Sequence, residues 1–83
     1  MKVTSVGSVL RAVRERAKLS QEELARRMHR SPSCISKYEN DRKVIDLPTL
    51  MQWAEETNAR EVVVAFLYGM DGISMLARLL GIG

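Results

Sequence analysis

Two signals for the start of a helix lie close together in the first half of the chain. Ser20 is followed three positions later by Glu23, a pattern in which the hydroxyl caps a helix amide and the glutamate reaches back to the cap. Ser31 is followed by Pro32, whose missing N–H costs nothing in the first turn of a helix. The spacing therefore predicts two short helices joined by a tight turn, over residues 21–28 and 32–39.

Helices this short are marginal in isolation, so the remaining chain has to support them. Apolar residues recur at helical spacing before and after the pair, and Asp46 is placed to cap a helix that buries Trp53. We expect Trp53 to be the largest single contribution to the core rather than a binding residue. The expected supporting helices cover residues 6–18, 47–56 and 59–68.

The helix over 59–68 competes with a strand, because Val62-Val63-Val64 is also typical of a strand. Asn58 and Glu61 repeat the capping pattern, and Gly69 can end the segment. The cap, the length and the lack of a partner strand favour a helix.

Residues 70–83 form an apolar C-terminal segment, in which Asp71 and Ser74 are expected to open a short helix over 73–80. After a five-helix domain has closed, such a segment either folds back as an extra layer or meets another chain. Because symmetric dimers are the commonest oligomers, we expect a homodimer through residues 62–80, with packing inside the chain as the alternative. The expected interface comprises Val63, Phe66, Leu67, Ile73, Leu76, Leu79 and Leu80.

Charge is unevenly distributed along this single small domain of 83 residues. Residues 1–43 hold eleven lysines and arginines and five acids, a net charge of +6, whereas residues 44–83 hold two and five, a net charge of −3. Such asymmetry favours a polyanionic partner, although chance clustering on a solvated surface would give the same count. The helical pair lies in the basic half.

Several functional classes are not expected from the composition. No apolar run approaches the roughly 18 residues that span a bilayer, so a cytosolic protein without a membrane partner is expected. One cysteine, Cys34, and one histidine, His29, leave no disulfide framework and no metal-ligand set, and no cofactor is expected. Without a Gly-rich phosphate loop or a paired carboxylate site, an enzyme is not expected either.

The ordered residues L-S-Q-E-E-L-A and then S-x-S-x-I-S-K-Y-E-N resemble the Cro/C1-type (XRE-like) helix-turn-helix family of phage and bacterial repressors. The resemblance runs from about Leu10 to Phe66. It implies an all-α fold, a five-helix lambda-repressor-like DNA-binding bundle over residues 1–69, with the segment 70–83 as a short extra C-terminal helix. It also implies that the third helix enters the major groove of DNA while the second crosses the backbone.

The resemblance also implies roles for individual residues. An arginine of the first helix and the glutamate ending the third commonly pair, which matches Arg14 and Glu39. The positions at the base edges are those of Pro32, Ser33, Ser36 and Lys37. The positions at the DNA backbone are those of Gln21, Arg30, Ser31, Asn40, Arg42 and Lys43.

The chain departs from the family pattern at two places. His29 replaces the turn glycine, so a backbone position that often has a positive φ must be held by a residue that tolerates it only moderately. Pro32 and Ser33 stand where relatives often carry Gln, Arg or Asn, which make bidentate base contacts. Lys37 is therefore the best candidate for reading bases, and Arg30, DNA deformability or dimer spacing would supply the remaining specificity.

Two functions remain open. The first is a sequence-specific DNA-binding transcriptional regulator, a cytoplasmic repressor of bacterial or phage origin that binds an inverted-repeat operator as a homodimer and associates with the nucleoid. The second keeps the fold but binds protein, as an adaptor, antirepressor or antitoxin acting on a regulatory partner through the apolar C-terminal surface.

Overall fold

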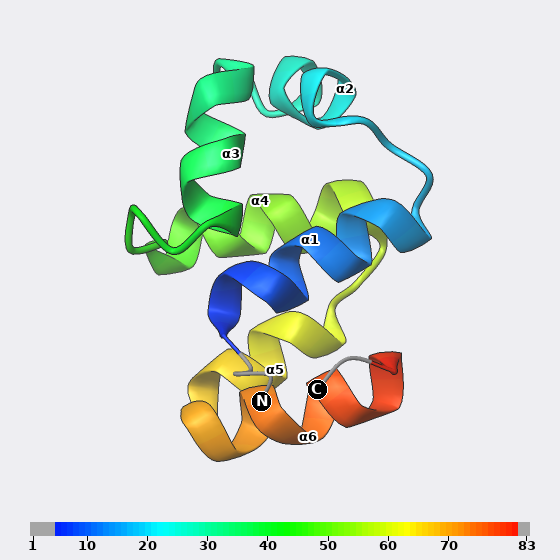
Figure 1. Cartoon of the computed structure of the whole chain (residues 1–83), viewed down its shortest axis with the longest axis vertical. Helices are drawn as coiled ribbons and strands as arrows, with labels where there is room; N and C mark the ends of the chain where they lie inside the picture. Colours follow the sequence, from blue (N-terminus) through cyan, green and yellow to red (C-terminus); the bar gives the residue numbers. More distant parts are fainter. Residues whose placement is uncertain (1–4, 82–83) are drawn as a thin grey trace.

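The computed structural model describes residues 5–81, and in this range the chain forms six helices and no strand. These are α1 (Val6–Arg16), α2 (Gln21–Arg27), α3 (Pro32–Glu39), α4 (Leu47–Thr57), α5 (Glu61–Leu67) and α6 (Met70–Leu80). Along the longest axis, α2 and α3 lie at one end, α1 and α4 in the middle, and α5 and α6 at the other end (Figure 1). The all-helical bundle predicted from the sequence is confirmed.

Three of the predicted helix starts are present with their caps. Ser20 accepts a hydrogen bond from the amide of Glu23 at 3.0 Å, and Glu23 accepts one from the amide of Ser20 at 3.1 Å. Ser31 accepts from the amide of Cys34 at 3.2 Å, and Asp46 Oδ1 accepts from that of Thr49 at 2.9 Å. These local bonds satisfy amides that would otherwise lack a partner at the helix ends.

The predicted opening of the fifth helix is wrong. Asn58 does not cap α5; it ends α4 in the left-handed conformation, with φ 53°, which asparagine tolerates better than most residues. Arg60 then precedes α5 without a side-chain cap. The helix consequently begins at Glu61, two residues later than expected.

The last helix starts earlier than the expected Ile73, and neither Asp71 nor Ser74 caps it. Gly69 adopts φ 75°, a conformation that a glycine reaches at little cost, and α6 begins at the next residue. At the other end of the chain, α1 stops at Arg16, because Lys18 has φ 62° and leaves the helix.

Trp53 lies at the centre of the core, as the sequence predicted. Its side chain is 0% exposed, and its indole Nε1 donates to the carbonyl of Leu10 at 3.2 Å. The ring of Tyr38 meets it edge to face, with 6.1 Å between the ring centroids. Trp53 therefore joins α4 to α1 and to α3, the helix that carries the candidate site.

The helix α6 folds back onto α5 and α1 instead of standing away from the bundle (Figure 1). Gly72 permits this, because a Cβ at this position would lie 2.4 Å from the carbonyl oxygen of Ala65. Ile73, Leu76 and Ala77 are buried by the contact. One face of the C-terminal segment is thus used inside the chain.

Candidate nucleic-acid interface

The turn between α2 and α3 depends on His29, which has φ 56°. The sequence predicted that His29 must hold a positive φ, and this is confirmed. The amide of Arg30 donates to the carbonyl of Ala25 at 2.8 Å, which closes the end of α2 immediately before the cap of α3. The turn therefore keeps the short length required by a helix-turn-helix.

A buried ion pair anchors the base of α3. Arg14 donates to both carboxylate oxygens of Glu39, from Nε at 2.6 Å and from Nη2 at 3.1 Å, and both side chains are almost fully buried. Arg14 also donates to the carbonyl of Leu19, and Gln21 donates its side-chain amide to Glu39 at 3.0 Å. The network joins α1, the start of α2 and the end of α3, which fixes the orientation of α3.

The outward side of α3 is polar while its inward side is apolar. Ile35 and Tyr38 are buried against the bundle. The outward side, which we call the α3 face, consists of Ser33, Ser36, Lys37 and Asn40, all exposed except the half-buried Ser36. The exposed Ser31 and Pro32 lie at its N-terminal end.

Asn40 and Ser36 are bonded to each other on this face. The Asn40 side-chain amide donates to the carbonyl oxygen of Ser36 at 2.8 Å and to its hydroxyl oxygen at 3.2 Å. Lys37 and Arg42 are exposed. The structure thus brings together, at one end of α3 and in the loop after it, four of the residues predicted to read bases or to contact the DNA backbone: Ser36, Lys37, Asn40 and Arg42.

Two predicted backbone residues are tied to the protein itself. Arg30 donates to the hydroxyl of Thr49 at 2.8 Å, and its guanidinium lies 5.9 Å from the centroid of the Tyr38 ring. The ammonium of Lys43 lies 5.3 Å from the same centroid. Both cations also reach within 3.8 Å of Cys34 Sγ. Their charge stays near α3, but part of their bonding capacity is used by the fold.

Asp41 is a residue whose role the sequence did not reveal. Its Oδ1 accepts from the amide of Gly7 at 2.9 Å and so caps α1 from the loop after α3. Gly7 is required for this approach, since a Cβ there would lie 2.4 Å from the carbonyl oxygen of Glu39. The partners are far apart in sequence, and no local pattern signals such a bond.

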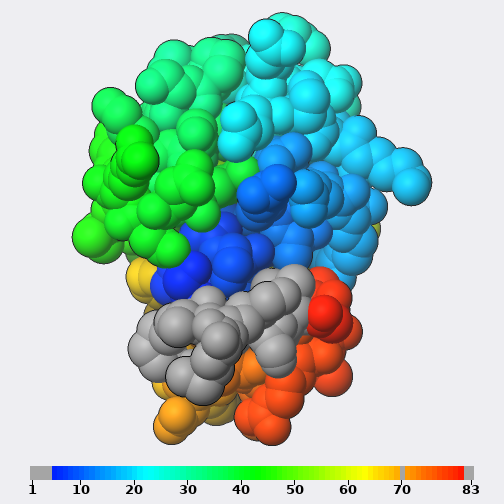
Figure 2. All heavy atoms as spheres, in the orientation of Figure 1, coloured from blue at the N-terminus to red at the C-terminus, as the bar shows by residue number. Residues whose placement is uncertain are grey.

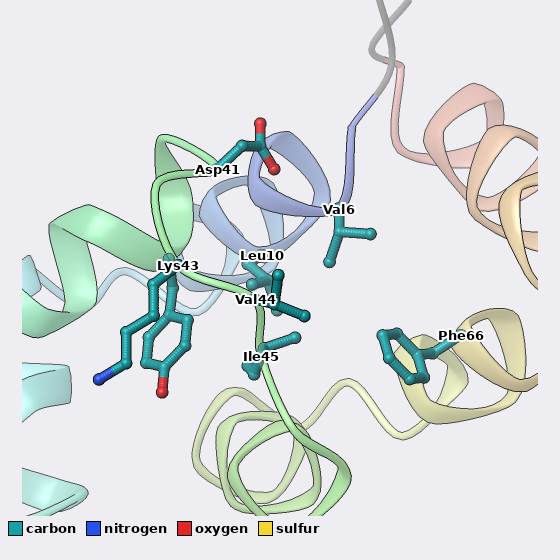
Figure 3. Close-up of a pocket in the computed structure, with 8 residues that line it drawn as sticks. Val6, Leu10, Asp41, Lys43, Val44, Ile45 and Phe66 are labelled. Atoms are coloured by element: carbon teal, nitrogen blue, oxygen red, sulfur yellow. The ribbon is translucent and has the colours of Figure 1, made fainter.

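A small cleft lies beside this loop, between α1 and α5 (Figure 3). Its volume is about 210 Å³, and Leu10, Ile45 and Phe66 line it together with other mostly apolar side chains. Within residues 5–81, no three His, Cys, Asp or Glu side chains gather where they could hold a metal ion. None of the six helices is both long and apolar enough to cross a bilayer.

The opposite end of the molecule carries exposed apolar side chains, which we call the α5–α6 face: Val64, Leu67, Tyr68, Met75 and Leu79. Of the residues expected at a dimer interface, Leu67 and Leu79 lie on this face and are 67% and 80% exposed. Ile73 and Leu76 lie in the core instead, 1% and 6% exposed, because α6 packs on its own chain. Val63, Phe66 and Leu80 pack partly against the core.

Val64, Tyr68 and Met75 were not predicted from the sequence to be surface residues of this face. The segment of α5 is apolar nearly all round, so its periodicity does not distinguish the inward side from the outward side. The segments of α2 and α3 form a surface that lies away from that of α5 and α6 (Figure 2). The first surface carries the polar α3 face and the second carries the apolar α5–α6 face.

The comparisons with known proteins agree with this geometry. A family model described as a helix-turn-helix domain matches residues 5–67, which include the two helices, the turn and the supporting helices α1, α4 and α5. The match supports the resemblance to the Cro/C1-type (XRE-like) group. No curated protein and no solved structure matches the chain significantly.

Proposed function

Because this chain belongs to the helix-turn-helix domain family, we propose that it is a sequence-specific transcriptional regulator that places α3 in the major groove of DNA. The observation that carries the proposal is the α3 face, which is polar and exposed while the Arg14–Glu39 pair holds the helix rigidly from below. A helix presented in this way fits the width of the major groove. The protein acts by occupying DNA and needs no catalysis and no cofactor.

Basic and polar residues around α3 would position the protein on the phosphates. Arg42 follows the helix and is exposed, and Ser31 lies exposed at its other end. Gln21 opens α2, but one N–H of its side-chain amide is used by Glu39, so only the second N–H remains to donate to a phosphate. Phosphate contacts fix register and orientation without reading sequence.

The proposal is tested with duplexes that the wild-type protein selects from a randomised library. The affinity of the protein for these duplexes is then measured. Fluorescence anisotropy should show that affinity falls steeply as the salt concentration rises, because neutralised phosphates release counterions. Lys37→Ala should weaken binding about tenfold, since a base contact contributes roughly 1–3 kcal/mol. Arg78→Ala, which removes one exposed positive charge from α6 at the other end, serves as the matched control. Equal losses in both variants would contradict the placement of α3 at the DNA.

We further propose that the regulator is a repressor that binds an inverted repeat as a homodimer through the α5–α6 face. The face is apolar and exposed, and it lies at the end away from α3, so a second copy there leaves α3 uncovered (Figure 1). Leu79→Glu should halve the mass seen in sedimentation, whereas Arg78→Glu should not. A monomeric wild-type protein would contradict this part of the proposal.

The same exposed face supports a second candidate function, an adaptor, antirepressor or antitoxin that binds a regulatory protein. Apolar association would change little with salt, in contrast to binding of phosphates. A chain that binds no duplex at any salt concentration would favour this alternative. In either case the expected setting is the cytoplasm of a bacterium or of a phage-infected cell.

A further inference from the structure

The orientation of the Asn40 side chain follows from its neighbour. The carbonyl oxygen of Ser36 lies 2.8 Å from the Asn40 amide nitrogen, and a carbonyl can only accept a hydrogen bond. If the amide were turned over, two acceptor oxygens would face each other at this distance. The NH₂ group therefore points at Ser36, and the choice does not depend on seeing hydrogens.

This orientation also determines how the Ser36 hydroxyl is used. The same NH₂ group lies 3.2 Å from Ser36 Oγ, so the hydroxyl oxygen accepts a hydrogen bond from Asn40. Hydroxyls elsewhere in the chain donate to nearby carbonyls, as Ser8 does to Ser5 and Thr57 does to Trp53. Ser36 makes no such bond within residues 5–81, so its proton is available on the outward side of α3.

The neighbouring side chain adds a second donor. Lys37 is exposed, and its ammonium can only donate. The two carboxylates that follow it are already in use, Glu39 by Arg14 and Gln21, and Asp41 by the amide of Gly7. Lys37 makes no ion pair within residues 5–81, so Ser36 and Lys37, which we call the donor pair, can both meet the DNA as donors.

We propose that the donor pair reads guanine, with Asn40 as the positioning residue that occupies one acceptor site of the Ser36 hydroxyl and so turns its proton away from Asn40. Guanine is the base that presents two acceptors in the major groove, N7 and O6, whereas adenine sets an N6 donor beside its N7 and cytosine presents an N4 donor. Facing adenine or thymine, the donor pair would find one acceptor for its two donors, and facing cytosine it would find none. The inference rests on the proposed function and adds to it the kind of base pair that the half-site must contain.

Duplexes with single-base analogues test this inference. A duplex selected by the wild-type protein from a randomised library is resynthesised with 7-deazaguanine at each guanine in turn, which removes N7 and preserves pairing. We expect at least one guanine per half-site at which the analogue weakens binding about fivefold, the effect of one lost hydrogen bond. Inosine at the same place removes only the minor-groove amino group and should leave affinity unchanged.

Variants then assign the effect to residues. Ser36→Ala should abolish the difference between guanine and 7-deazaguanine at one position, and Lys37→Ala should reduce it at the same or the adjacent one. Asn40→Ala empties the acceptor site that Asn40 fills and lets the Ser36 hydroxyl rotate, so it should lower the preference for guanine over adenine at the Ser36 position. In the Ser36→Ala background, Asn40→Ala should leave the preference for guanine over adenine unchanged. If Asn40 only stabilised the fold, Asn40→Ala would have the same effect with and without the Ser36 hydroxyl. Ser74→Ala in α6 is the control.

The outcomes separate the two claims. If the wild-type protein binds no duplex, the proposed function fails and the inference fails with it. If the protein binds a selected sequence but no guanine is sensitive to loss of N7, or if Asn40→Ala acts equally with and without the Ser36 hydroxyl, the inference alone is overturned.

Discussion

Four residues other than glycine hold a left-handed backbone in the described part of the chain: Lys18, His29, Asp41 and Asn58. Each lies just after a helix and turns the chain towards the next element. For His29 the family pattern predicted the positive φ, because relatives commonly carry a glycine at this position of the turn. For Lys18 nothing in its side chain signals the conformation, which explains why the first helix was expected to run two residues too far.

His29→Gly should stabilise the protein. A left-handed conformation costs a residue with a Cβ about 1–2 kcal/mol, and the greater freedom of glycine in the unfolded chain offsets part of the gain. We expect the free energy of unfolding in urea to rise by roughly 0.5–1 kcal/mol. Glu55→Gly on the exposed side of α4 should instead lower it by about 1 kcal/mol. A destabilised His29→Gly protein would show that the imidazole makes a contact that outweighs the strain.

Arg14→Met should be strongly destabilising. The substitution leaves the carboxylate of Glu39 buried with only the amide of Gln21 as partner, and breaking a buried pair in this way costs about 3–5 kcal/mol. Arg11→Met breaks the exposed pair with Glu15 and should cost less than about 1 kcal/mol in the same urea titration. The double variant with Glu39→Gln should recover part of the loss. Similar small losses for Arg14→Met and Arg11→Met would mean that the network does not hold α3.

The first residue of a helix was predicted well where neighbouring residues form its cap, and poorly where the helix has no side-chain cap. The starts of α2, α3 and α4 depend on side chains within three residues, so the sequence carries the whole signal. The starts of α5 and α6 depend on Arg60 and Gly69, which make no side-chain cap. Their positions are decided by how the helices pack on the bundle, which a local pattern does not contain.

The cap of α4 should make stability depend on pH. Hydrogen bonds from Thr49, from its side chain and its backbone amide, hold the pKa of Asp46 below its ordinary value. The folded state then favours the carboxylate, so the cap stabilises fully above the ordinary pKa of about 4 and its contribution is lost as the pH falls through the lower folded value.

Asp46→Asn separates this effect from the rest of the acid transition. Asparagine also caps a helix but does not titrate, so the variant should lose less free energy of unfolding than the wild-type protein between pH 5 and about pH 2. Urea titrations at both pH values measure the difference. Asp71→Asn in α6, where no side chain caps the helix, is the control. Parallel losses in wild type and Asp46→Asn would contradict the role of the cap.

At the scale of the whole molecule, the helix order and the outward polar side of α3 could be predicted from apolar spacing and the family resemblance. The contacts that hold α3 in place could be predicted only in part. The hydrogen bonds that the Gly7 amide donates to Asp41 and that Arg30 donates to Thr49 join residues far apart in sequence, so they exist only after the chain has folded. The buried side of α6 could not be predicted either, because it is determined by how the helix packs against α1 and α5.

The measurement closest to the central claim is the change in backbone amide NMR shifts when a selected duplex is added. If α3 enters the major groove, the amides of Ser31, of Ser33 to Asn40 and of Arg42 should shift or broaden. Those of α6, from Asp71 to Leu80, should stay unchanged or move only as a dimer contact requires. Shifts confined to α5 and α6, with α3 unaffected at saturating duplex, would contradict the account.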